Sequence, residues 1–290
     1  MRFLVLFLLS LVSLSALDFN ISSKITSNAR TQYIEFEKKE NIKYERLVDG
    51  KRVYGIFNHP LDKTKVYALL PTSYYQKPKS TSVKIIYTKN GKKKKESFVL
   101  QIKDAKYKKE KIQVQKSKVN PKSKEVKRRI AKEYKKAMDI YGYASPRSYI
   151  KNSFIVPMES KITSDFGKAR VYNNELNGYH SGTDFRAKIG TPIIASNDGK
   201  IVLVQDRFYS GNSVIIDHGQ GIYTCYYHMS EFTVKKNEMV KRGQVIGLSG
   251  DTGRITGPHL HFSARVGGLQ VDPLQLIELL NKNLLLRETI

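Results

Sequence analysis

The sequence is poor in the features that stabilise or anchor many exported proteins. It contains one cysteine, Cys225, and no tryptophan in 290 residues. A single cysteine excludes an intrachain disulfide, so stability must come from packing and from any bound metal. The apolar run at the N-terminus falls short of the roughly 20 residues that a membrane-spanning helix needs. The sequence also lacks an H-E-x-x-H motif, which excludes the helix-borne glutamate base of one class of metal enzymes.

The N-terminal run has the order of an export signal. MRFLVLFLLSLVSLSA begins with the basic Arg2, continues as an apolar run from Phe3, and ends in small residues up to Ala16. A membrane anchor is disfavoured because serines interrupt the run. No cysteine lies near the junction, which argues against a lipid-modified N-terminus. We expect residues 1–16 to be a cleaved signal peptide and the protein to be exported, into the periplasm if the host is Gram-negative.

Acidic residues are scarce in the first half only. The chain holds 51 Lys and Arg against 26 Asp and Glu, a net charge of +25. Residues 150–290 hold only 16 of these basic residues and 13 acidic ones, so residues 1–149 carry most of the excess. An exported chain without a recognisable binding motif is not expected to bind nucleic acid. The basic half either contacts an anionic wall polymer or membrane surface or is a solvated surface, and the charge alone leaves both open.

The residues after the signal are enough for two domains. Residues 17–116 read as short strands, and Asn90-Gly91 favours a hairpin because both residues accept a positive φ. Alternating apolar residues flank this turn on both sides: Val83, Ile85 and Tyr87 before it, and Phe98, Leu100 and Ile102 after it. We predict a small antiparallel β-sandwich here. The lysines at 92–95 are better explained as a charged sheet edge than as a binding site.

A basic helical linker is predicted for residues 117–149. Asn120-Pro121 is a helix-start signal and Gly142 a stop. The predicted apolar stripe, spaced three to four residues apart, is Val126, Ile130, Tyr134, Met138 and Tyr141. Such a stripe predicts a helix that packs on a neighbouring domain, in preference to a membrane-surface helix.

Residues 150–290 read as a second, antiparallel β domain. The predicted strands are short apolar runs at close spacing: 192–195, 200–204, 213–216, 222–227, 245–248 and 261–266. A closing helix is predicted for Leu274–Leu286.

The histidines of this second part carry the chemical signal. His180 and Asp184 are four residues apart and His259 and His261 are two apart, so each pair shares one face of a strand. Zinc binds nitrogen and carboxylate oxygen, and a catalytic site usually has three protein ligands and a water. His180, Asp184 and one of the final pair can supply that set. A hydrogen-bonded structural histidine is the alternative for each pair taken alone.

Three motifs in this order resemble those of the lysostaphin/LytM-type zinc metallopeptidases, which are peptidoglycan endopeptidases. The motifs are His180-x-x-x-Asp184, Tyr226-Tyr227-His228 and His259-Leu-His261. Segments around them match as well: 162–167, 190–193, 210–223, 240–247 and 256–262. The upstream part resembles, through less specific motifs, the immunoglobulin-like module and helical linker of some exported Gram-negative members.

The resemblance implies a mainly β chain: an immunoglobulin-like sandwich, a helical linker and a LytM-type peptidase domain over residues 150–290. It implies one zinc ion per chain, bound by His180, Asp184 and His261. His228 and His259 are then the catalytic residues beside the metal-bound water. The remaining candidates, His59, His218 and Cys225, are read as structural.

The implied substrate is the stem peptide of peptidoglycan. The resemblance implies a D,D-endopeptidase that cuts D-Ala to meso-diaminopimelate cross-links, with D,D-carboxypeptidase activity at the same site, acting in wall remodelling and cell shape. The alternative is a non-catalytic relative that binds peptidoglycan or activates an amidase, although such relatives lack several of the five positions. We expect a monomer by default.

Overall fold

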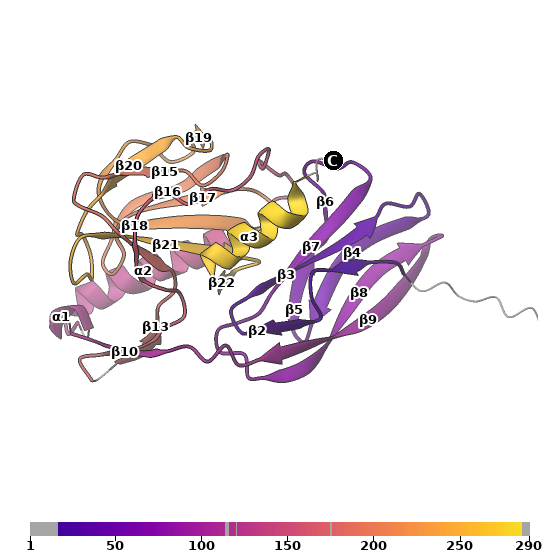
Figure 1. Cartoon of the computed structure of the whole chain (residues 1–290), viewed down its shortest axis with the longest axis horizontal. Coiled ribbons are helices and arrows are strands. Elements are labelled where there is room, and N and C mark those ends of the chain that lie inside the picture. The colour runs from indigo at the N-terminus through magenta and orange to yellow at the C-terminus, as the bar shows by residue number, and fades with distance from the viewer. Residues whose placement is uncertain (1–16, 114–115, 120, 175, 286–290) are drawn as a thin grey trace, which may run out of the picture.

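The computed structural model describes residues 17–113, 116–119, 121–174 and 176–285. It confirms a mainly β chain (Figure 1). Along these residues, an N-terminal set of strands is followed by two helices, a second set of strands and a last helix. The predicted signal peptide, residues 1–16, lies outside the described residues. None of the helices in the described part is long and apolar enough to cross a membrane.

The N-terminal strands form two sheets that share a core. The first sheet has the order β1 (Asn20–Ile21), β3 (Thr31–Glu37), β7 (Lys65–Pro71) and β6 (Phe57–Asn58). The second has the order β2 (Ile25–Ser27), β9 (Lys92–Lys103), β8 (Lys79–Lys89), β4 (Ile42–Asp49) and β5 (Arg52–Gly55). One buried cluster takes side chains from both, including Phe36 and Leu70 from the first and Leu47, Ile85 and Leu100 from the second. The two sheets therefore pack face to face, whereas an immunoglobulin-like topology stays a prediction.

The predicted hairpin is confirmed. Strands β8 and β9 pair antiparallel, with Val83 opposite Phe98. Asn90 and Gly91 form the turn with φ of 50° and 75°, the left-handed values that this dipeptide tolerates. The lysines at 92–95 are exposed at the start of β9.

The linker helix begins later than predicted. A strand, β10 (Lys109–Ile112), and a short helix, α1 (Lys116–Val119), precede the long helix α2 (Lys124–Tyr141). Ser123 is the N-cap, since its hydroxyl accepts the Val126 amide, and Asn120 lies outside the described residues. The predicted stop at Gly142 is confirmed.

The buried face of α2 also differs from the predicted stripe. Glu133, Ala137 and Tyr141 are buried, whereas Tyr134 is 63% exposed. Glu133 can be buried because its carboxylate accepts hydrogen bonds from Arg129 Nε at 2.6 Å and from the Phe208 amide at 2.9 Å. The predicted stripe is right at Tyr141 and at Met138, which packs against the same cluster, but it misses Glu133 and Ala137.

The C-terminal part is built on a large antiparallel sheet. Its main path runs β11 (Ile162–Ser164), β14 (Thr183–Arg186), β21 (His259–Val266), β18 (Ile222–Phe232), β17 (Gly211–Asp217), β16 (Gly199–Arg207) and β19 (Met239–Val240). Three further strands attach to it: β15 (Pro192–Ile194), β20 (Val245–Ser249) and β22 (Leu269–Val271). The predicted runs at 192–195, 200–204, 213–216, 222–227, 245–248 and 261–266 all overlap strands of this sheet.

A small sheet joins the linker to the C-terminal part. Strand β10 pairs in parallel with β12 (Ala169–Tyr172), which pairs with β13 (Leu176–Tyr179). Residues 109–112, assigned from sequence to the N-terminal sandwich, thus hydrogen bond to the second half. The domain boundaries at 116/117 and 149/150 stay predictions.

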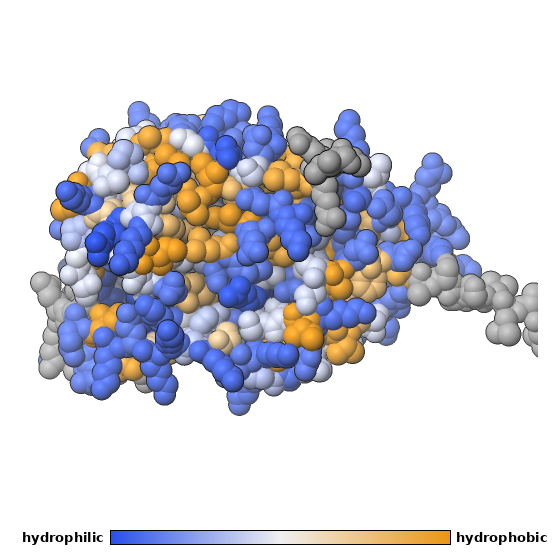
Figure 2. All heavy atoms as spheres, viewed as in Figure 1, coloured by the Kyte–Doolittle hydropathy of each residue, from blue (hydrophilic) through white to orange (hydrophobic). Residues whose placement is uncertain are grey.

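The last helix, α3 (Pro273–Leu284), lies between the two halves (Figure 1). Asp272 caps it by accepting the Leu274 and Gln275 amides. The predicted closing helix is confirmed, but it ends at Leu284 and not at Leu286. Residue 286 lies outside the described residues. A buried cluster joins α3 to both halves, for example through Tyr67 and Leu276. Figure 2 shows hydrophobic side chains over the C-terminal sheet and mainly hydrophilic ones at the outer edge of the sandwich.

The two faces of the large sheet have different coverings. Tyr226 of β18 points into the main core with Leu260 and Phe262. The alternate residues Cys225 and Tyr227 point to the other face, where they pack against Ala137 and Tyr141 of α2. Cys225 is fully buried, as predicted. Since Tyr227 is the cross-strand partner of His261, α2 and the candidate site residues share one face of the sheet.

Candidate metal centre

His180, Asp184 and His261 come together because β14 and the turn before it lie beside β21. Asp184 on β14 lies directly opposite His261 on β21. His180 lies in the turn between β13 and β14, where its amide donates to the Lys168 carbonyl. Gly182 permits this close approach, because a Cβ there would lie 2.6 Å from Nε2 of His261.

The three side chains place one donor atom each within a small volume. His180 Nε2 lies 2.9 Å from Asp184 Oδ1 and 3.0 Å from His261 Nδ1. His261 Nδ1 lies 2.8 Å from the same carboxylate oxygen. All three residues are buried, and together they form a group that could hold a metal ion.

The hydrogen bonds around His180 show why this group fits a cation. Its Nδ1 lies 2.7 Å from the Asp165 carbonyl oxygen, which can only accept, so Nδ1 carries the hydrogen. The Nε2 of the neutral ring is then an acceptor that faces an Asp184 oxygen, another acceptor. Two acceptors at this distance repel unless a positive charge lies between them. Two imidazole nitrogens and a carboxylate oxygen are the donor types that zinc binds.

The protonation states agree with this arrangement. Burial by itself raises the pKa of Asp184, but its contacts with the two imidazoles outweigh burial and hold that pKa well below its usual range. Burial lowers the pKa of His261 to about 4, so the ring is neutral at neutral pH. Neutral imidazole and ionised carboxylate are the forms that bind metals.

His228 and His259 lie beside this group. Their ring centres are 5.1 Å apart, and His259 Nε2 lies 3.5 Å from Asp184 Oδ1. The Nδ1 atoms donate to backbone carbonyls, of Thr252 at 2.7 Å and of Gly257 at 2.8 Å. In the neutral form of each ring, Nε2 is then the nitrogen without a hydrogen.

His228 has an unusual backbone. Its φ is 62°, and the register between β17 and β18 shifts at this point. Its amide donates to the Ser210 carbonyl at 2.9 Å, which holds the bulge in place. Positive φ in a residue other than glycine or asparagine often marks a functional site. Burial, followed by the neighbouring His261 and His259, lowers the pKa of His228 to about 3.

The other candidates lie elsewhere. His218 is buried, with Nδ1 2.8 Å from the Asp198 carbonyl and Nε2 2.7 Å from the Thr224 hydroxyl. His59, on the N-terminal side of the molecule, accepts the Leu61 and Asp62 amides within its own turn. Both geometries are those expected of structural residues.

Sequence reasoning missed Arg170 and Glu110. Arg170 on β12 donates to the second carboxylate oxygen of Asp184 at 3.3 Å and to the Ser164 hydroxyl at 3.2 Å. Its Nε donates to Glu110 at 3.1 Å, and Glu110 lies opposite it in the β10–β12 register. A lone arginine ten residues before His180 has no spacing signal, and 60 residues separate it from Glu110.

The N-terminal half contributes a further contact near His180. Tyr74 stacks on Tyr179, with ring centres 3.7 Å apart, and its hydroxyl donates to the Gly167 carbonyl. The loop after β7 therefore lies against the β12–β13 hairpin.

The fold and the site define a class: an antiparallel β domain with a buried His-Asp-His group that fits a divalent metal. Residues 178–273 match the family model of peptidase family M23. This segment of the chain is thus of the M23 metallopeptidase type, as the three motifs indicate.

Curated relatives match over the same part of the chain. Peptidoglycan DD-endopeptidase ShyA of Vibrio cholerae is 45% identical over 122 residues, 41% of this chain and 28% of ShyA. DD-carboxypeptidase/endopeptidase Mpg of Neisseria meningitidis is 44% identical over 117 residues, 40% of this chain and 27% of Mpg. The alignments thus span under a third of these relatives.

Solved structures extend the likeness. A peptidase M23 from Pseudomonas aeruginosa superposes with a TM-score of 0.63 at 25% identity, covering 84% of this chain and 92% of that one. The catalytic domain of lysostaphin from Staphylococcus simulans is 36% identical, with a TM-score of 0.38, and the match covers 41% of this chain and 92% of that domain.

Proposed function

We propose that the protein is an exported zinc metallopeptidase that hydrolyses the peptide cross-links of peptidoglycan. The observation that carries the proposal is the convergence of His180, Asp184 and His261, with His228 and His259 beside them, inside the M23-matching segment. The relatives are named peptidoglycan DD-endopeptidases and a DD-carboxypeptidase/endopeptidase. We therefore assign D,D-endopeptidase activity to this site, with D,D-carboxypeptidase activity as a second reaction there.

His180, Asp184 and His261 are the proposed ligands of one zinc ion per chain. Bound there, zinc supplies Lewis acidity that polarises the scissile carbonyl and activates water. Asp165 and Arg170 orient two of these ligands through His180 Nδ1 and the second Asp184 oxygen.

His228 and His259 handle the protons in this mechanism. Each donates Nδ1–H to a backbone carbonyl, which fixes the ring and leaves Nε2 to accept a proton from water and return it to the leaving amine. Burial lowers the pKa of His228 to about 3, so the ring is neutral at neutral pH.

We further propose that residues 1–16 direct export, to the periplasm of a Gram-negative host, where the enzyme remodels the wall and influences cell shape. The basic residues of the first half, such as the exposed lysines at 92–95, suit contact with an anionic wall or membrane surface. A monomer that does not bind nucleic acid is the simplest form.

Digestion of purified sacculi tests the proposal. The mature protein should release new muropeptides, identified by mass spectrometry as cleaved cross-links, and EDTA should abolish them until zinc is restored. Ala at His180, Asp184 or His261 should remove bound zinc, whereas His228→Ala and His259→Ala should retain most of the zinc and lose turnover. Sacculi that stay intact with a zinc-loaded wild-type protein would instead favour the non-catalytic, amidase-activating alternative.

A further inference from the structure

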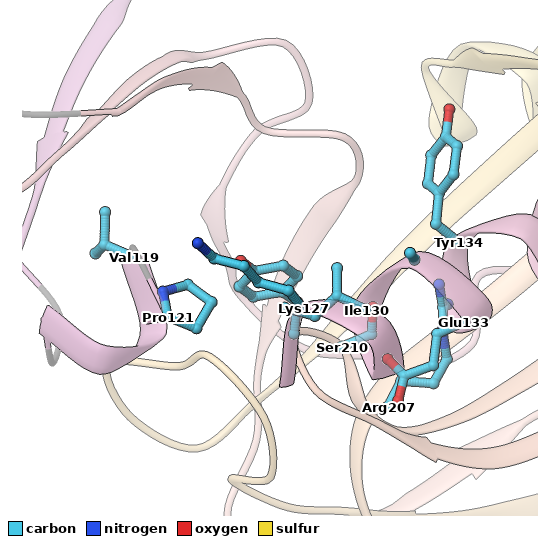
Figure 3. Close-up of a pocket in the computed structure, with 10 residues that line it drawn as sticks. Val119, Pro121, Lys127, Ile130, Glu133, Tyr134, Arg207 and Ser210 are labelled. Atoms are coloured by element: carbon cyan, nitrogen blue, oxygen red, sulfur yellow. The ribbon is translucent and has the colours of Figure 1, made fainter. Parts of the chain in front are cut away.

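A cavity of about 510 Å³ lies between helix α2 and the turn that joins β16 to β17. Lys127, Ile130 and Tyr134 line it from α2, Arg207 lines it from the end of β16, and Ser210 lines it from the turn (Figure 3). Neither the family motifs nor the mechanism above uses this cavity.

The cavity has an unpaired positive charge. Nε of Arg207 is buried and has no hydrogen-bond partner, and Arg207 makes no ion pair among the residues that the structure describes. The one carboxylate in the lining, Glu133, is already engaged by Arg129 Nε and by the Phe208 amide. Lys127 adds a second cation at the rim. A buried donor without a partner is unfavourable.

The cavity adjoins the candidate metal centre on the same face of the sheet. The Ser210 carbonyl accepts a hydrogen bond from the His228 amide. A residue of the cavity wall is therefore hydrogen-bonded to a proposed catalytic residue. The Arg207 guanidinium lies 6.0 Å from the Tyr227 ring, which in turn stacks on His261 with ring centres 5.4 Å apart. An extended peptide advances about 3.3 Å per residue, so a few substrate residues reach from one place to the other.

We propose that this cavity is a substrate subsite in which Arg207, assisted by Lys127, binds a carboxylate of the peptide being cut. The inference rests on the proposed function and adds the group that the enzyme recognises away from the scissile bond. A guanidinium binds carboxylate through paired hydrogen bonds. The carboxylate is either the C-terminal one of a stem peptide or the free carboxylate of the diaminopimelate in the stem that donates the D-Ala.

Steady-state kinetics of the zinc-loaded full chain with three synthetic probes tests the subsite. The first is a stem-peptide dimer cross-linked from D-Ala to meso-diaminopimelate, with free carboxylates. The second has amidated C-termini, and the third is amidated at the diaminopimelate carboxylate of the stem that donates the D-Ala. We expect one amidation to raise KM roughly tenfold with kcat little changed, and Arg207→Met to raise KM for the first probe by a similar factor. The amidation that matters identifies the carboxylate.

Two further variants keep the test clear. Lys127→Gln alters an exposed helix residue that cannot disturb folding, and it should raise KM for the free-carboxylate dimer several-fold. Arg242→Met removes an exposed arginine from the β19–β20 turn and should leave KM unchanged. Equal KM values for the three dimers, unaffected by Arg207→Met and Lys127→Gln, would overturn the subsite while leaving the proposed function intact. If the wild type cuts none of the dimers, the proposed function fails and the subsite with it.

Discussion

At the scale of single residues, the candidate site depends on which ring nitrogen of each histidine carries the hydrogen. His180, His228 and His259 each place Nδ1 against a backbone carbonyl, of Asp165, Thr252 and Gly257. In the neutral rings, this shared tautomer leaves three Nε2 acceptors in one small region. Main-chain atoms set this chemistry, and a main-chain partner is less easily lost by substitution than a side chain.

Arg170 should strengthen metal binding without touching the metal. Its guanidinium donates hydrogen bonds to the second Asp184 oxygen and to Glu110, which fixes its position. Arg170→Leu should weaken zinc affinity roughly 10- to 100-fold, the usual cost of losing a residue that orients a ligand. Competition with a chromogenic chelator measures this directly. Arg170→Lys should recover part of the affinity, Glu110→Gln should lose less than Arg170→Leu, and an unchanged affinity in Arg170→Leu would contradict the assignment.

His218 should make stability depend on pH. Burial lowers its folded-state pKa to about 4, whereas an unfolded histidine titrates near 6.5. As the pH falls from 6.5 towards 4, the unfolded chain gains a proton that the folded protein does not, so folding stability is lost over that window. Between pH 7 and 4.5 the wild type should lose roughly 2–3 kcal/mol more than His218→Gln, by differential scanning calorimetry. Parallel pH dependences would show that His218 is not the cause.

At the scale of secondary structure elements, α2 is where local pattern and tertiary packing disagree. The helix has two tyrosines in different settings: Tyr141 is 3% exposed and Tyr134 is 63% exposed. Tyr141 packs on β18, where its hydroxyl lies 3.3 Å from both Cys225 Sγ and the Tyr227 hydroxyl.

Alanine substitutions at these two tyrosines form a matched pair. Tyr141→Ala should cost about 3–5 kcal/mol of unfolding free energy, because it leaves a cavity under the helix. Tyr134→Ala should change it by less than about 0.5 kcal/mol, as expected for an exposed position. Urea denaturation of both variants measures the difference. Equal effects would mean that the helix presents another face to the sheet.

At the scale of the whole molecule, the linker is structurally part of the C-terminal half. Strand β10 belongs to the small sheet with β12 and β13, and α2 covers the face that bears the candidate metal ligands. The N-terminal sandwich packs separately, through Tyr67, whose hydroxyl donates to Gln220 at 2.6 Å, and through α3.

Two truncated proteins should show this. A fragment of residues 104–290 keeps β10 and α2, whereas a fragment of residues 150–290 loses both and exposes Tyr223 and Cys225. Both lose the contact with the sandwich, so their difference reports on the linker alone. The shorter fragment should melt roughly 10 °C lower, since the loss amounts to several kcal/mol. Equal melting temperatures of the two fragments would show that the linker does not stabilise the C-terminal half.

Local rules were enough for part of the fold and the site. Asn90-Gly91 fixes its own turn, and the spacing of two between His259 and His261 puts both on one face of β21, because strands alternate with a period of two. The resemblance of the three motifs then indicated which five residues belong together, and the structure brings them together.

Packing between distant segments decided the rest. The buried face of α2, the Glu110–Arg170–Asp184 chain and the cavity beside α2 all join residues far apart in sequence. Periodicity says which residues of one element share a face, but not which element covers that face. A charged residue such as Glu133 is buried only when a partner from another element satisfies it, and that partner exists only in the folded chain.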